Sequence, residues 1–375
     1  MSGVVVLGAT GSIGRQALEV TADEAIPVVA LAARRGGTDF MALAEAHPDA
    51  ALAVAEPDDP ADLTDRFGGR VAFGPEAVVE LAAIPGTTVV NGVVGAAGLR
   101  ASLAAARAGN RLGLANKESL VAAGPLVTAA VAAGGGELFP IDSEHSAIHQ
   151  CLLGEPPEAV RRLILTASGG PFRGRRLADL ADVTAEEALA HPTWRMGPRI
   201  TIDSATLVNK GLEVIEAHHL FGVDFDRIDV VVHPQSIVHS LVEFVDGSLK
   251  AHLGEPDMRV PIRYALTAPN RGEAPSAFSL PGLELTFEEP DTDAFPALRL
   301  AFEAGRAGGG APAAFNAADE VAVAAFLAGR IAFTDIPGVI ASVLDRLGAP
   351  PIPDVAAVDA VDAAARRLAD AAIGP

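Results

Sequence analysis

Near its N-terminus the chain has a short apolar run followed by three evenly spaced glycines, and this feature limits the folds open to it. Val4–Leu7 has the composition of a buried strand, Gly8, Gly11 and Gly14 follow, and a helical pattern begins at Arg15. A strand, a glycine turn and a helix form a corner whose backbone N–H groups and helix dipole suit a pyrophosphate. The spacing is Gly-x-x-Gly-x-x-Gly, so the flanking strand and helix carry the prediction of a dinucleotide-binding domain.

Further apolar runs alternate with helical patterns, as a doubly wound parallel sheet requires. The expected strands are Val28–Ala33, Ala51–Val54, Thr87–Val90 and Arg111–Ala115. In such a sheet the carboxyl ends of the strands face the ligand. We therefore expect the glycine-rich turn Asn91–Gly95 and Lys117 on the cofactor side.

Two arginines, Arg34 and Arg35, follow the second expected strand. A site for NAD usually places an acid there to hold the ribose hydroxyls, whereas arginines suit a 2′-phosphate. The pair favours NADP. An exposed loop that happens to be basic is the alternative.

The segment Pro140–His145 contains two carboxylates, Asp142 and Glu144, two residues apart. If this segment is extended, both point to one face and Ser143 to the other. Two like charges side by side are unfavourable unless a cation joins them, and a hard divalent ion accepts such oxygen ligands. A metal site is one interpretation, and a solvated strand end is the other.

A second polar set lies in residues 202–216, which we predict to be helical. Asn209, Lys210 and Glu213 would share one helix face. An amide, an ammonium and a carboxylate together suit a phosphorylated polyol and a third metal ligand, although an exposed amphipathic helix has the same pattern. Only three of the 28 basic residues are Lys, which suggests that Lys210 fills a site needing a compact ammonium.

Two more segments are candidates for ligand contact. Ser168-Gly169-Gly170 ends an apolar run and offers a hydroxyl and N–H groups to an anion, or forms an ordinary turn. His191–Pro198 holds the only Trp of the chain between helix breakers. It could close over a ligand as a lid, or remain a static surface loop.

Composition narrows the class of protein. The net charge of −20 over 375 residues argues against nucleic-acid binding, and the single Cys excludes an intramolecular disulfide. No apolar run of about 18 residues and no leader pattern is found, so we expect no membrane association and a cytoplasmic location. The predicted division is a cofactor domain at 1–136, a central α+β catalytic domain at 137–268, a proline-rich linker at 269–290 and a helical domain at 291–375.

The order of these motifs resembles the 1-deoxy-D-xylulose 5-phosphate reductoisomerase family over nearly the whole chain. The most specific stretch is Ile202–Glu213, Ile-Asp-Ser-Ala-Thr-Leu-Val-Asn-Lys-Gly-Leu-Glu. The matching stretches also include Gly8–Gly14, Asn116–Glu118, Asp142–Ile148, Thr166–Phe172, His191–Gly197 and His233–Pro261. The resemblance implies an α/β, Rossmann-like enzyme that converts its ketose phosphate to 2-C-methyl-D-erythritol 4-phosphate in non-mevalonate isoprenoid synthesis. It also implies NADPH, a divalent metal (Mn²⁺, Mg²⁺ or Co²⁺) and a homodimer.

Residue roles carry over from the resemblance position by position. The implied metal ligands are Asp142, Glu144 and Glu213, which with Lys117 form the catalytic set. The implied substrate contacts are Lys117, Ser143, Glu144, Ser168, His191, Ser204, Asn209, Lys210 and Glu213, with Trp194 and Met196 as a flap. The implied cofactor contacts are Thr10, Gly11, Ser12, Ile13, Asn116, Glu118 and Gly197, together with Arg34, Arg35 and Gly36 at the adenosine end.

The sequence departs from the family pattern at residues 34–36, and two other functions remain as alternatives. The family often has Gly-x-Asn where this chain has Arg34-Arg35-Gly36, which leaves the adenosine-end contacts undecided. A metal-assisted NADP dehydrogenase of another sugar phosphate would have much the same ligands. A non-catalytic NADP-binding sensor would have no use for the acidic and lysine residues together.

Overall fold

The computed structural model describes residues 3–95, 97–194, 196–273 and 278–374. The chain forms two compact units, which we describe separately. The first comprises Met1–Ser119, Pro125–Ser146 and Asp257–Ala277, and the second Leu120–Gly124, Ala147–Pro256 and Phe278–Pro375. The finer division into three domains and a linker stays a prediction.

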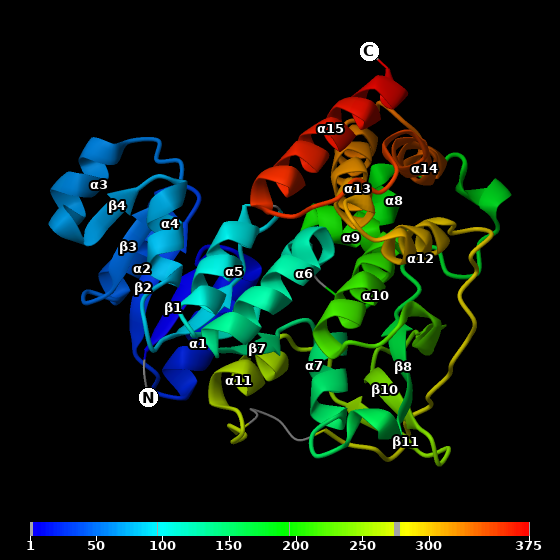
Figure 1. Ribbon diagram of the computed structural model, residues 1–375, viewed down its shortest axis with the longest axis horizontal. Helices are drawn as coiled ribbons and strands as arrows, with labels where there is room; N and C mark the ends of the chain where they lie inside the picture. The colour runs from blue at the N-terminus through cyan, green and yellow to red at the C-terminus, as the bar shows by residue number, and fades with distance from the viewer. Residues whose placement is uncertain (1–2, 96, 195, 274–277, 375) are drawn as a thin grey trace. The chain divides into compact units, whose positions relative to one another are not determined.

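A seven-stranded, wholly parallel sheet forms the centre of the first unit (Figure 1), which confirms the Rossmann-like prediction. Its spatial order is β4-β3-β2-β1-β5-β6-β7. The strands are β1 (Val4–Leu7), β2 (Val28–Ala33), β3 (Ala51–Val54), β4 (Val71–Phe73), β5 (Thr88–Asn91), β6 (Arg111–Leu114) and β7 (Glu137–Pro140). The short β4 was not predicted, because three residues give too little apolar periodicity to recognise.

Helices connect these strands and bury their apolar side chains. They are α1 (Ser12–Asp23), α2 (Thr38–Ala46), α3 (Pro60–Phe67), α4 (Pro75–Ala82), α5 (Gly98–Arg107) and α6 (Lys117–Gly134), and α11 (Arg259–Thr267) joins them from later in the chain. The chain moves outward from β1 through β4, returns to β5 and then moves the other way. This reversal, between β1 and β5, is where an open α/β sheet binds its ligand.

The second unit contains a four-stranded mixed sheet in the order β11-β10-β8-β9. Strands β8 (Val160–Ala167) and β9 (Ile228–Val232) are parallel, whereas β10 (Val238–Phe244) runs antiparallel to both β8 and β11 (Leu249–Leu253). The helices before and between these strands are α7 (Ser143–Cys151), α8 (Ala185–Leu189), α9 (Pro198–Ala205) and α10 (Val208–Phe221). The residues of α7 up to Ser146 belong to the first unit. Strand β11 is a largely exposed sheet edge.

Four helices complete the second unit: α12 (Ala297–Ala307), α13 (Ala311–Leu327), α14 (Ile336–Leu347) and α15 (Val355–Ile373). Figure 1 shows α13, α14 and α15 side by side, with α9 next to α13, and contacts of α13 with α9, α14 and α15 agree. Short 3-10 helices occur at Gly68–Arg70, Pro157–Ala159, Leu177–Leu180, Phe225–Arg227 and Phe333–Asp335. None of the helices in the described ranges is long and apolar enough to span a membrane.

The helix predicted over residues 202–216 is in fact two helices. Helix α9 ends at Ala205 and α10 begins at Val208, and between them Leu207 has a φ of 61°. A left-handed conformation is costly for a branched apolar residue and persists where the surrounding packing fixes it. Leu207 is buried, so its side chain holds the sharp bend that separates Ser204 from Asn209.

Candidate active site

The turn after β1 has the geometry of a dinucleotide corner. Gly8 has a φ of 79°, and a Cβ there would lie 2.6 Å from the carbonyl oxygen of Gly92. A Cβ on Gly14 would lie 2.3 Å from the Gly8 carbonyl oxygen. Gly11 occupies the N-cap of α1 and has no side chain to cover the first backbone N–H groups. The turn can therefore bring an anion close to the helix N-terminus.

Arg34 and Arg35 lie directly beyond β2 and both form ion pairs. Arg34 Nε is 2.9 Å from a Glu56 oxygen, and Arg35 pairs with Asp58. All four side chains are more than half exposed, so these pairs contribute little to stability. The two guanidinium groups can exchange their carboxylate partners for a phosphate at small cost.

Asn116 and Glu118 fasten the loop that follows β5. Asn116 Nδ2 donates to the carbonyls of Val93 at 2.8 Å and Gly95 at 2.9 Å, and Glu118 Oε1 accepts from the Gly95 N–H at 3.1 Å. Both residues are buried. They shape the loop at the switch point of the sheet, and direct contact between them and a cofactor stays a prediction.

Lys117 and Asp142 form a nearly buried ion pair in the first unit. The Nζ–Oδ2 distance is 2.9 Å, and the side chains are 9% and 13% exposed. The expectation that Asp142 and Glu144 share a face of an extended segment was wrong. Strand β7 ends at Pro140, Glu144 lies in the first turn of α7, and its N–H donates to Asp142 Oδ1 at 3.2 Å. Asp142 thus caps the helix that carries Ser143 and Glu144, which keeps both carboxylates together by a different local structure.

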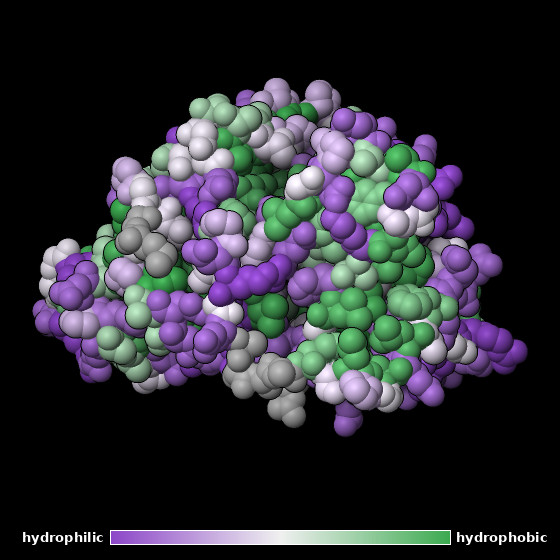
Figure 2. All heavy atoms as spheres, turned by 90° about the horizontal axis from the view of Figure 1, so that it is seen from below, coloured by the Kyte–Doolittle hydropathy of each residue, from purple (hydrophilic) through white to green (hydrophobic). Residues whose placement is uncertain are grey.

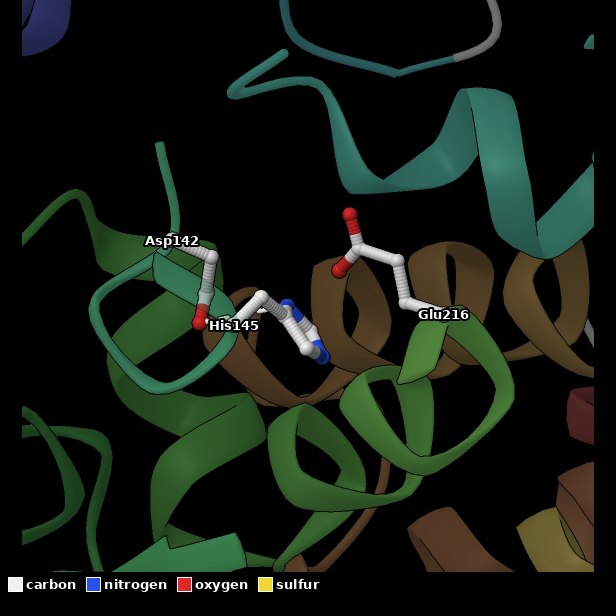
Figure 3. A group of neighbouring side chains, drawn as sticks. All are labelled: Asp142, His145 and Glu216. Atoms are coloured by element: carbon white, nitrogen blue, oxygen red, sulfur yellow. Dashed lines mark ion pairs between the residues drawn. The ribbon is translucent and has the colours of Figure 1, made fainter. Parts of the chain in front are cut away.

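Asp142 has a second neighbour that the sequence did not single out. His145 Nδ1 lies 3.4 Å from Asp142 Oδ1, and Figure 3 shows the two side chains facing each other. His145 is fully buried. The i to i+3 spacing on α7 was the available signal. Figure 3 also labels Glu216, a buried carboxylate that α10 carries in the second unit, one turn after Glu213.

In the second unit Ser168 and His191 are joined. Ser168 Oγ lies 2.9 Å from His191 Nε2, and His191 Nδ1 accepts from the backbone N–H groups of Thr193 and Trp194 at 3.1 and 2.9 Å. Because Nδ1 accepts, Nε2 carries the proton and donates to Ser168. Burial also lowers the pKa of His191 below its usual value, so the imidazole is neutral at pH 7.

The three polar residues predicted to share a helix face do so on α10. Asn209 Nδ2 donates to Glu213 Oε1 at 2.6 Å, and Lys210 Nζ pairs with Glu213 Oε2. Glu213 and Lys210 are 1% and 3% exposed. The neighbouring candidate Ser204 lies at the end of α9, half-buried. An exposed amphipathic helix is thereby excluded, because the polar face is buried.

The two units together define the class of protein: an α/β oxidoreductase with a dinucleotide corner, paired carboxylates in one unit and a buried Lys–Glu helix in the other. Family models for 1-deoxy-D-xylulose 5-phosphate reductoisomerase match residues 4–124, with the C-terminal domain models of the same enzyme matching 138–221 and 253–368.

Individual proteins agree with the family models. The curated 1-deoxy-D-xylulose 5-phosphate reductoisomerase of Xanthomonas campestris pv. campestris (strain 8004) is 52% identical, over 99% of this chain and 96% of its own length. That of Heliobacterium modesticaldum is 49% identical, over 99% and 97%. The solved Zymomonas mobilis enzyme in complex with NADPH is 44% identical, with a TM-score of 0.92 over 99% of both chains. A structure of DOX-P reductoisomerase with NADPH, fosmidomycin and magnesium is 39% identical, with a TM-score of 0.91 over 100% of this chain and 98% of its own. This chain belongs to the 1-deoxy-D-xylulose 5-phosphate reductoisomerase family.

Proposed function

We propose that this chain converts 1-deoxy-D-xylulose 5-phosphate to 2-C-methyl-D-erythritol 4-phosphate, with NADPH and a divalent metal ion, in non-mevalonate isoprenoid precursor synthesis. The observation that carries this proposal is family membership over the full chain. The acidic and lysine residues Asp142, Glu144, Glu213, Lys117 and Lys210 support it. The relatives solved with NADPH and magnesium support the choice of cofactors.

Asp142, Glu144 and Glu213 are the proposed metal ligands. Each offers a carboxylate oxygen, Asp142 and Glu144 from the first unit and Glu213 from the second. Their oxygens fit Mg²⁺ and Mn²⁺, and the nearby cations Lys117 and Lys210 offset their charge. Asn209 and Lys210 hydrogen-bond Glu213 and so fix the orientation of its carboxylate.

The substrate's phosphate and hydroxyls are proposed to bind polar side chains of the second unit. Ser168, Ser204, Asn209 and Lys210 offer hydroxyl, amide and ammonium donors to phosphate oxygens. Neutral His191 keeps Ser168 Oγ as an acceptor from Nε2, which directs the hydroxyl proton toward a ligand. Ser143 and Lys117 are proposed to contact the substrate from the first unit, and Trp194 and Met196 to cover it as a flap.

NADPH is proposed to bind at the switch point of the seven-stranded sheet. Its pyrophosphate would meet the backbone of Thr10–Ile13, and its 2′-phosphate would meet Arg34, Arg35 and Gly36. Asn116, Glu118 and Gly197 complete the proposed contact set. When bound, the metal would polarise neighbouring substrate oxygens during the skeletal rearrangement, and NADPH would supply the hydride that reduces the resulting aldehyde.

We also propose a cytoplasmic homodimer. Two-fold symmetric dimers are the commonest oligomers, and β11 presents an exposed edge whose residues include Leu249. Figure 2 shows an apolar area on the right of the face it draws. Light scattering coupled to size exclusion tests this: a particle of twice the 38.2 kDa chain mass is expected, and a monomer at micromolar concentration would refute it.

The reaction is tested by mixing the protein with 1-deoxy-D-xylulose 5-phosphate, NADPH and Mg²⁺ or Mn²⁺ and following NADPH absorbance. Consumption should require the metal, be abolished by EDTA, and fall strongly with NADH and in Glu213→Gln. Binding of NADPH without its oxidation would refute the proposal. It would favour either a non-catalytic NADP-binding sensor or an enzyme that acts on another sugar phosphate.

A further inference from the structure

Arg199, in the first turn of α9, is bound by one helix of the C-terminal part of the second unit. Its Nη1 lies 2.9 Å from Glu320 Oε1, and its Nη2 lies 2.7 Å from Asn316 Oδ1 and 3.4 Å from Asp319 Oδ2. All three partners are on α13. The same guanidinium also pairs with Asp203, one turn along α9, at 3.6 Å. Arg199 therefore links α9 to α13 through several polar contacts.

The link continues from α13 to α15. Glu320 Oε2 accepts from Arg366 Nη2 at 2.6 Å, and Arg366 Nε donates to Asp362 at 2.7 Å. Asn316 Nδ2 donates to Glu320 Oε1 at 3.2 Å, so Glu320 joins both arginines and the amide. Asp203 and Asp319 are essentially buried, and Arg199 is 22% exposed. Hydrogen-bonded polar groups in a largely buried network hold their neighbours in one arrangement, because breaking one bond leaves a costly unpaired group.

Helix α9 lies between two parts of the proposed substrate site. Trp194 and Met196 directly precede it, and Ser204 lies in its last turn. A shift of α9 would displace all three residues together. Lysine could replace only part of the link, because a single ammonium cannot reproduce the planar fork that reaches Glu320 and Asn316 at once.

We propose that Arg199 is a positioning residue that fixes the position of α9 through its contacts with α13 and, beyond it, α15. The position of α9 in turn places the flap residues and Ser204 for binding of the substrate phosphate. This inference rests on the proposed function for its kinetic part. It assigns the C-terminal helices a role in substrate affinity, although none of their residues is proposed to contact the substrate.

Steady-state kinetics of Arg199→Ala, Arg199→Lys, Glu320→Gln and the Arg199→Ala/Glu320→Gln double variant test the proposal. Arg199→Ala should raise KM for the sugar phosphate about tenfold, the effect of losing one charge-assisted hydrogen bond, and leave KM for NADPH unchanged. Arg199→Lys should recover part of the loss. Glu320→Gln should raise the same KM, and the double variant should be no worse than Arg199→Ala, because both changes break one link. The matched control is Arg306→Ala on α12, which removes an exposed ion pair with Asp226. It should change neither KM.

A second readout needs no turnover. Trp194 is the only Trp of the chain, and its ring lies 6.4 Å from that of His239. Arg199→Ala and Glu320→Gln should increase acrylamide quenching of its fluorescence, whereas Arg306→Ala should not. If the wild type shows no turnover, the proposed function fails and the quenching alone decides the positioning claim.

Two results would overturn the proposal. One is a folded Arg199→Ala variant whose KM for the sugar phosphate and whose Trp194 quenching both equal those of the wild type. If Arg199→Ala does not fold, the same result in folded Glu320→Gln would overturn the proposal. The other is additivity of Arg199→Ala and Glu320→Gln, which would show that Arg199 acts through its own charge and not through α13.

Discussion

Replacing Asp319 by Asn should stabilise the protein at neutral pH, and the gain should disappear in acid. Asp319 is completely buried on α13. Burial, above all, raises the pKa of its carboxyl from 3.8 to about 6; nearby Glu320 adds to this, while Arg199 and a hydrogen bond with Asp203 oppose it. The environment thus favours the neutral carboxyl, which an Asn amide imitates in shape.

The sign and size follow from proton linkage. Since the folded pKa lies above the unfolded value, the folded protein binds a proton that the unfolded chain releases between pH 3.8 and 6. The stabilisation by that proton is complete below pH 3.8 and is lost as pH rises through 6. Two pKa units at 1.36 kcal/mol each give about 3 kcal/mol as an upper limit. Asp319→Asn does not ionise, so it should lose none of this and be more stable than the wild type by up to about 3 kcal/mol at pH 7.5.

The assay is urea unfolding of both proteins at several pH values from 4 to 8, followed by circular dichroism. The difference in unfolding free energy should grow with pH to a plateau above 6. Asp226→Asn, which alters the exposed pair with Arg306, serves as the control and should track the wild type. Parallel curves for Asp319→Asn and wild type, or an Asn variant that is weakest at pH 7.5, would refute the reasoning.

Three other perturbations give separate tests. Gly14→Ala should lose most NADPH binding in a titration, because its Cβ would lie 2.3 Å from a carbonyl oxygen. The control Gly37→Ala, which has no atom within 4 Å of its Cβ, should bind NADPH normally. Equal binding by both variants would show that the turn is not the cofactor corner. His219→Gln should make the unfolding free energy depend less on pH in acid. Burial, and then His218, lower the pKa of His219 to about 4, so the wild type loses up to about 3 kcal/mol of unfolding free energy as pH falls from 6.5 to 4. The same pH dependence in urea unfolding of the variant and the wild type would contradict this. The double change of Arg34 and Arg35 to Ala should weaken NADPH binding at least about tenfold and leave NADH binding nearly unchanged, as loss of charge-assisted contacts to the 2′-phosphate requires; equal losses for both cofactors would place the 2′-phosphate elsewhere.

The sequence allowed the dinucleotide-binding half to be predicted well, because its strands are continuous apolar runs and its glycines are dictated by sterics. Asn209, Lys210 and Glu213 were likewise predictable, since residues three and four apart on a helix are always neighbours. The extended reading of Asp142–Glu144 failed because the cap formed by Asp142 outweighed the strand pattern before it. Leu207 gave no signal of the bend it makes, since packing and not propensity holds its positive φ. The hydrogen bonds of Arg199 with α13 join residues more than a hundred positions apart. No local sequence pattern predicts such a contact.

The most direct test of the central claim is the identity of the product. The protein should be incubated with 1-deoxy-D-xylulose 5-phosphate, NADPH and Mg²⁺, and the product's carbon skeleton determined by ¹³C NMR with one NADPH counted per molecule formed. We expect the branched 2-C-methyl-D-erythritol 4-phosphate, with both rearrangement and reduction absent when EDTA is present. A straight-chain reduced sugar phosphate would contradict the account, because it would show hydride transfer without the rearrangement that the acidic and lysine residues are proposed to support.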